Sequence, residues 1–266
     1  PSRADLAFFT PRSRKILAAV AMHQGKLDEA SVHYHEGVAV GREIGDQNGT
    51  ATSLHGLALV ARKQGDYEQA LSYYQQTLEI LRTLGSQRNI ALTLNNLGIL
   101  SLAQGYPEQA LEYLFQSLQI KQALGDQSGV AYSYISIGRA KQALGDYAQG
   151  QDYLARSLAM LQKIGDQVGI ACSYMHWGFL QLEMENRSAQ ASFLEGLKIA
   201  QTLHSMPILL ETLVGLAHCY LQQGDATLAA QLAGFVEHAS TTYIDVRQRL
   251  QVLIPLLAQA LTSDLL

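Results

Sequence analysis

The chain has 266 residues, of which 48% are hydrophobic and 16% are charged, with a formal net charge of −4. This composition supplies a large core and excludes disordered and collagen-like chains. The 19 Lys and Arg residues are scattered, and no stretch approaches the roughly 18 apolar residues that cross a bilayer, so we expect neither a direct nucleic-acid partner nor a membrane span.

A polar fragment recurs along the chain at a constant spacing. GDQNG, GSQRN, GDQSG and GDQVG begin at Gly45, Gly85, Gly125 and Gly165. A fixed period of this length indicates one supersecondary unit stacked on copies of itself. Aligning the copies gives six units, the fifth shorter by one residue at its internal turn, and we predict helical hairpins over about 5–44, 45–84, 85–124, 125–164, 165–203 and 204–243.

Two columns of the alignment support a hairpin in each unit. In the first half, a large residue precedes a small one, which lets another helix approach closely. These pairs are Leu17-Ala18, Leu57-Ala58, Leu97-Gly98, Ile137-Gly138, Trp177-Gly178 and Leu216-Ala217. In the second half, a small residue recurs at Ala30, Ala70, Ala110, Gly150, Ala189 and Ala229. We therefore expect two packed helices in every unit.

Capping residues mark the expected helix ends. Thr10 followed by Pro11 reads as an N-cap and a first helical residue, and Pro107 occupies the start of a second helix, where its missing N–H costs nothing. The recurring Gly is expected to end one unit in the left-handed conformation, with Asp or Ser starting the next. After the last hairpin, apolar spacing predicts a capping helix over about 243–262 that Pro255 should kink or split.

The large-small pair, the Gly-Asp-Tyr turn and the second-helix Ala together resemble the tetratricopeptide repeat (TPR). The forty-residue spacing and the Gly-Asp-Gln-x-Gly joints are similar to the subclass found in G-protein-signalling modulators, kinesin light chains and bacterial signal-transduction ATPase (STAND) regulators. The LAAQLAGFVEHAS stretch is similar to the end of repeat domains in STAND transcription regulators. The resemblance implies an all-α fold, a right-handed α-solenoid of about six hairpins forming a single domain over 1–266.

The family also implies a ligand-binding groove lined by the first helices. Carried over unit by unit, its contact positions fall on His55, Leu59, Arg62, Asn95, Asn96, Ile99, Tyr132, Ile135, Arg139, Met175, His176, Phe179 and His218. Asn96 stands where the family often places an amide that both donates to and accepts from a peptide backbone. Arg139 could pair with a carboxylate, although too few such residues occur together for the family's carboxylate clamp.

Other interpretations of these residues remain open. Tyr132, Met175 and Phe179 could equally be core between repeats, and Trp177 fits the core column better than a surface. Cys172 and His176, four residues apart, could share a helix face and hold a metal, but two ligands make a poor site. Histidines on the predicted groove could also make binding depend on pH.

The resemblance implies recognition rather than catalysis. No nucleophile elbow, P-loop or paired His-Glu metal motif is present, so we expect neither an enzyme nor a cofactor. The two cysteines give no disulfide framework and favour a cytoplasmic protein. Because the first residue is Pro1 rather than Met, we expect a part of a longer protein, namely the sensor domain of a signalling ATPase or transcription regulator that binds a protein, a peptide or a small effector. A free-standing scaffold or adaptor, and a receptor for a small diffusible ligand, are the alternatives.

Overall fold

The computed structural model describes residues 11–239 and 244–263, and within them it contains thirteen α-helices and no strand. The all-α fold class predicted from the repeat is confirmed. The helices form two compact units, 1–124 and 125–266. Thr10, expected as an N-cap, and residues 240–243 at the end of the sixth predicted hairpin lie outside the described residues.

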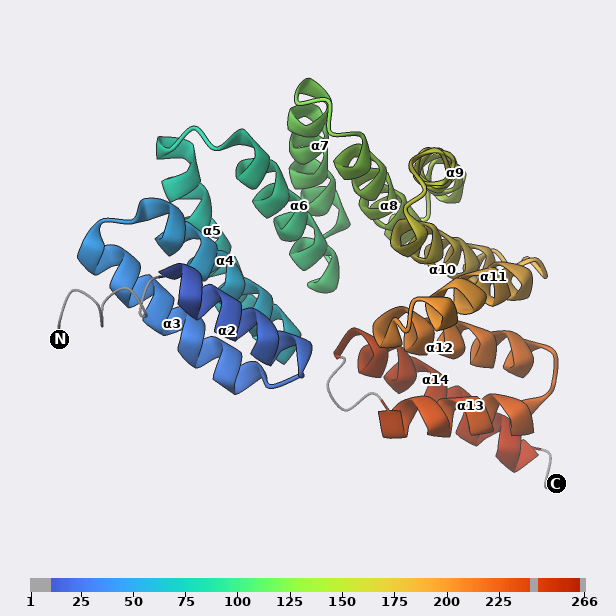
Figure 1. The fold of residues 1–266 in the computed structure, drawn as a ribbon. Coiled ribbons are helices and arrows are strands. Elements are labelled where there is room, and N and C mark those ends of the chain that lie inside the picture. The colour runs from blue at the N-terminus through green and yellow to red at the C-terminus, as the bar shows by residue number, and fades with distance from the viewer. Residues whose placement is uncertain (1–10, 240–243, 264–266) are drawn as a thin grey trace. The chain divides into compact units, whose positions relative to one another are not determined.

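Unit 1 consists of three consecutive helical hairpins, each made of a first and a second helix (Figure 1). Its helices are α2 (Pro11–His23), α3 (Leu27–Ile44), α4 (Gln47–Gln64), α5 (Tyr67–Thr83), α6 (Gln87–Ala103) and α7 (Pro107–Ala123). The first helices α2, α4 and α6 follow one another at intervals of one repeat. Consecutive hairpins therefore present equivalent positions of their first helices side by side.

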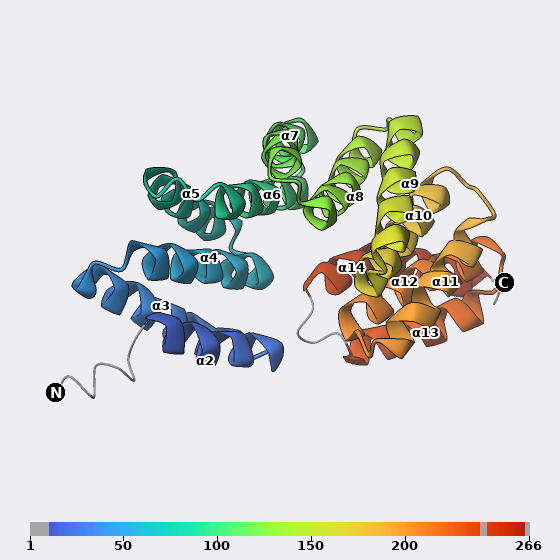
Figure 2. The ribbon, with the colours of Figure 1, turned by 45° about the horizontal axis from the view of Figure 1, so that its top comes forward.

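Unit 2 consists of three further hairpins and a terminal helix (Figure 2). Its helices are α8 (Gln127–Ala143), α9 (Tyr147–Ile164), α10 (Gln167–Glu183), α11 (Ala189–Thr202), α12 (Met206–Gln222), α13 (Ala226–Ala239) and α14 (Ile244–Ser263). Helix α14 packs against both α12 and α13, as expected of a capping helix. It runs as one helix through Pro255 and is not split there.

The polar joints between repeats end and begin helices as the sequence predicts. Gly45 and Gly165 adopt φ angles of 73° and 80°, a left-handed conformation that glycine adopts without strain. The Asp46 carboxylate then accepts a hydrogen bond of 2.9 Å from the Gly49 amide, which caps α4. Asp126 and Asp166 cap α8 and α10 in the same way. At the two joints that carry Ser in place of Asp, neither Ser86 nor Ser205 makes such a bond.

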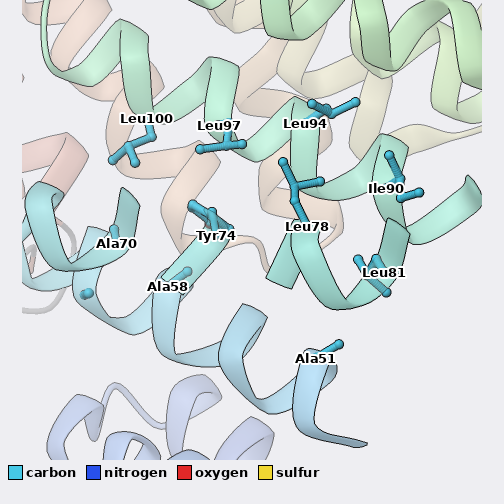
Figure 3. Close-up of a cluster of buried hydrophobic side chains, with 11 residues drawn as sticks. Ala51, Ala58, Ala70, Tyr74, Leu78, Leu81, Ile90, Leu94, Leu97 and Leu100 are labelled. Atoms are coloured by element: carbon cyan, nitrogen blue, oxygen red, sulfur yellow. The ribbon is translucent and has the colours of Figure 1, made fainter. Parts of the chain in front are cut away.

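The core of each unit lies between the two helices of a hairpin and the next first helix. In unit 1, Ala70, Tyr74 and Leu78 of α5 face Leu94 and Leu97 of α6, and all are buried (Figure 3). The small residues of the alignment lie where two helices approach closely, as predicted. Ala58 and Ala70 are both fully buried where α4 and α5 meet. None of the described helices is both long and apolar enough to cross a membrane.

Candidate functional site

A pocket of about 280 Å³ opens on the first helices of unit 1. Its walls come from Lys15 of α2, from Thr52, His55 and Leu59 of α4, and from α6. The α6 contribution consists of Asn89, Leu92 and Thr93. The remaining lining residues are Tyr34, Ala51, Gly56, Thr77 and Leu81. We call this cavity the unit 1 pocket. It combines aliphatic side chains and one tyrosine with hydroxyl, amide, imidazole and ammonium groups, a mixture typical of ligand sites.

His55 is held in one orientation by side chains of α6. The Asn96 Nδ2 amide lies 3.1 Å from His55 Nε2, and Thr93 Oγ1 lies 3.4 Å from Nδ1. The amide is a donor, so Nε2 must accept, and we assign the ring proton to Nδ1. This assignment is consistent with Thr93, whose hydroxyl donates to the Asn89 carbonyl at 2.9 Å and therefore offers its oxygen as an acceptor to Nδ1.

The surroundings of His55 keep the imidazole neutral. Burial, and in second place the positive charge of Lys15, lowers the pKa of His55 to about 4. Beneath it, the buried Tyr74 ring meets the imidazole in an edge contact with 5.5 Å between ring centroids. The imidazole is therefore a fixed, uncharged feature of the pocket wall at neutral pH.

The other groove residues predicted in unit 1 fall into two groups. Leu59, Arg62, Asn96 and Ile99 are partly exposed on α4 and α6. Asn95 is buried, and its Oδ1 accepts a bond of 3.3 Å from Lys121 Nζ of α7. Asn95 therefore joins the two helices of its own hairpin instead of facing a ligand.

Most groove residues predicted in unit 2 contribute to packing. Ile135, Met175 and Phe179 are only 3% to 5% exposed and belong to hydrophobic clusters. The Tyr132 hydroxyl donates a bond of 3.0 Å to Asp166, the residue that caps α10. Burial, followed by this bond and the carboxylate charge, raises the pKa of Tyr132. These side chains connect neighbouring hairpins.

Beyond its apolar packing on α12, helix α14 reaches α10 through one arginine. The Arg249 guanidinium lies 3.8 Å from the centroid of the Phe179 ring on α10, and its Nε lies 3.4 Å from a Glu211 carboxylate oxygen on α12. His176 is buried, and its pKa is lowered by burial and by the charges of Arg139 and Arg249. The pKa of His218 is lowered by burial and by Arg249. Arg249 of the terminal helix thus packs on Phe179, and its charge acts on His176 and His218, three residues of the predicted groove.

Replacing Arg249 with methionine tests how α14 is held. The variant loses the cation–π contact and the bond to Glu211 while keeping an unbranched side chain that can still pack, so we expect a loss of about 1–2 kcal/mol in the free energy of unfolding. Amide hydrogen exchange in residues 244–263 should accelerate more than exchange in α8. The exposed Arg247→Met, on the same helix, is the matched control. Unchanged exchange in α14 would show that the apolar contacts alone hold the helix.

The reactive side chains of unit 2 are not arranged for chemistry. Burial, reinforced by Glu211, raises the pKa of the Cys172 thiol to about 12, and burial raises that of Cys219 to about 11, so both thiols stay protonated. Within the described residues, no three His, Cys, Asp or Glu side chains are grouped to hold a metal ion. The Cys172–His176 pair thus has no third ligand in that part of the chain.

Several pocket residues were missed by reasoning from sequence. Lys15, Thr52, Asn89, Leu92 and Thr93 line the unit 1 pocket but were not among the predicted contacts. The repeat register contained one usable signal, because Lys15 precedes His55 by one period and so occupies the same position of its helix. The others become recognisable only when three first helices are placed side by side.

Several solved structures have similar folds at low sequence identity. A Rap protein complexed with Competence and Sporulation Factor shares 18% identity, with a TM-score of 0.70 over 94% of this chain and 76% of that one. NprR in complex with its cognate peptide NprX shares 12% identity, with a TM-score of 0.71 over 89% and 68%. A STAND protein with a TPR sensor from Pyrococcus horikoshii shares 18% identity, with a TM-score of 0.63. The match covers 94% of this chain but only 38% of that protein. At these low sequence identities, the structural similarity shows a shared fold and nothing more.

Comparison with family models is more specific. No curated protein matches the sequence significantly. A model of anaphase-promoting complex subunit 5 matches residues 140–219. The tetratricopeptide repeat model matches residues 11–83 and 87–167, which together exceed half of the chain. The repeated hairpins, their caps and this match agree, and the chain belongs to the tetratricopeptide repeat family.

Proposed function

We propose that this chain is a ligand-recognition domain that binds a peptide or protein segment at the unit 1 pocket. The observation that carries the proposal is the pocket itself, in which aliphatic side chains stand beside the polar groups of Thr52 and Asn89 on two first helices. Such a wall suits an extended peptide segment, which has side chains to bury and a backbone whose donors and acceptors need hydrogen-bond partners.

Two features support peptides over other ligands. NprR, a structural neighbour, is solved with its cognate peptide, and a neighbouring Rap protein is solved with Competence and Sporulation Factor. In addition, the Nδ1 proton of His55 and the Asn96 amide are held by the bonds described above, so the wall is already ordered before a ligand arrives. Pre-ordering lowers the entropic cost of binding.

We further propose that the domain is the sensor or interaction part of a larger signalling protein in the cytoplasm. The STAND protein with a TPR sensor supports this proposal, since this chain matches only a part of that protein. Ligand binding would then stabilise unit 1, and the attached module would respond to that change. Sequencing the complete gene tests this part, and a product without an attached ATPase or regulatory module would contradict it.

Filling the pocket tests the binding proposal. Thr52 is half-buried in the pocket wall, so Thr52→Trp places an indole ring in the cavity. Peptides are selected from a random phage-displayed library on the unmodified protein and are then measured by fluorescence anisotropy. We expect Thr52→Trp to weaken their binding by about tenfold or more, because the ring occupies the space that a ligand side chain needs.

The matched control is Thr83→Trp, which makes the same change at an exposed position of α5. It should bind the selected peptides as the unmodified protein does, and circular dichroism should show equal helicity for both variants. Equal binding by Thr52→Trp would place the site elsewhere. A library that yields no binding peptide would reject peptide recognition.

A further inference from the structure

The charges of unit 1 are segregated between its first and second helices. The first helices α2, α4 and α6 contain no Asp or Glu, and their charged residues are Arg12, Arg14, Lys15, Arg62, Lys63 and Arg88. The second helices carry the acidic residues, namely Asp28, Glu29, Glu36, Glu43, Glu68, Glu79, Glu108 and Glu112. The net charge of the whole chain hides this division, because the two sets largely cancel.

The positive charge extends to the unit 1 pocket through Lys15. Lys15 is exposed on α2 and is the one charged residue among those that line the cavity. No ion pair joins its ammonium group to a carboxylate within the described residues. Arg14, one position earlier, differs in this respect, because it is paired with Glu36 of α3 at 2.8 Å. A ligand at the pocket therefore meets a positive field that the protein's own carboxylates do not neutralise there.

We propose that the unit 1 pocket selects acidic peptides. An aliphatic side chain of the ligand enters the cavity beside Leu59 and Leu92, and a neighbouring Asp or Glu carboxylate pairs with Lys15. This inference rests on the proposed function and specifies its ligand. The surrounding cations of α4 and α6 add long-range attraction and increase the rate of encounter.

The same surface is poorly suited to nucleic acid, the other common polyanion. Single-stranded nucleic acids bind by stacking bases on aromatic side chains along a basic track. The helices α2, α4 and α6 contain no Phe, Tyr or Trp. Tyr34 of α3 is the one Phe, Tyr or Trp among the pocket-lining residues, and it is only 7% exposed, so the pocket offers no track of aromatic rings. Its aliphatic and hydroxyl groups match peptide side chains and backbone instead.

Two matched pools of short random peptides test the inference. One pool carries Glu at every third position, and the other carries Gln at the same positions. We expect the Glu pool to bind the unmodified protein about tenfold more tightly at about 50 mM NaCl, and the difference to shrink at about 300 mM NaCl. Lys15→Gln should reduce the preference about three- to tenfold, and Lys15→Arg should keep it. Lys163→Gln, an equal charge change at an exposed position of α9, should have little effect.

Three other results of this experiment would each contradict a specific part of the proposal. If both pools bind equally well, or if Lys15→Gln keeps the full preference, the acidic selectivity is wrong while peptide recognition stands. If neither pool binds, the proposed function fails together with the inference. If labelled oligo-dT binds more tightly than the Glu pool under the same conditions, the surface is a nucleic-acid site and the commitment to peptides is wrong.

Discussion

Replacing Phe193 with alanine is expected to lower the free energy of unfolding of unit 2 by about 3–5 kcal/mol. Phe193 of α11 is fully buried, and its ring makes an edge contact with Phe179, with 4.9 Å between centroids. A Cβ at Gly178 would lie 2.7 Å from this ring, and the ring also fills the space beside Gly215. The side chain thus occupies a slot between α10 and α12 that exists only because both helices carry glycine there.

Chemical denaturation followed by circular dichroism measures this loss. Hydrogen exchange then locates it, because amides of α10, α11 and α12 should exchange faster while those of α2 and α3 remain as protected as before. Phe235→Ala on α13 makes the same chemical change at a side chain that is 56% exposed, and it should cost less than about 1 kcal/mol. Similar losses for the two variants would contradict the role given to the glycine slot.

The fold was predictable because its determinants are local and repeated. A left-handed Gly ends one helix, and the Asp that follows it caps the next helix. This adjacent pair recurs at Gly45-Asp46, Gly125-Asp126 and Gly165-Asp166. The small residue of each second helix is likewise read directly from the alignment. Repetition supplies several independent copies of each weak signal, so helix positions follow from sequence alone.

Whether a side chain of a first helix is buried or lines the groove was harder to predict, because core and surface positions differ by a fraction of a helical turn. Met175 and Phe179 stand at the aligned positions of His55 and Leu59, yet the first pair is buried and the second pair lines a pocket. The difference in unit 2 includes α14, whose Arg249 covers Phe179. Because α14 lies outside the repeat pattern, the aligned repeat sequences do not show which of their side chains it contacts.

Buried hydroxyls show a second limit. Ser117 of α7 and Ser157 of α9 each donate to a carbonyl of the preceding first helix, Ala91 and Ala131, at 2.7 and 2.9 Å. In sequence these serines look like ordinary polar residues of a second helix. Their role depends on how closely two helices approach, which is a property of the packed hairpin and not of either helix.

Lowering the pH from 7 to 5 is expected to destabilise the protein through His55. The pKa of this imidazole is lowered to about 4 in the folded state, whereas an unfolded histidine has a pKa near 6.5. Above about pH 6.5 neither state binds the proton, and below it only the unfolded state does so until about pH 4. Stability is therefore complete at neutral pH and falls as the pH decreases, by about 2 kcal/mol at pH 5 from this residue. His176 and His218 act in the same direction.

Urea unfolding at several pH values between 7 and 5 measures this slope, in a range where most carboxylates stay ionised. His55→Gln removes the titrating group while its amide oxygen can still accept from Asn96, so the variant should show a shallower loss of stability on acidification. His35→Gln, at an exposed position of α3, should follow the unmodified protein. If His55→Gln loses stability as steeply as the unmodified protein, the imidazole is not held neutral by its surroundings. The pocket wall would then carry a charge that changes between pH 7 and 5, and acidic peptides would bind more tightly at the lower pH.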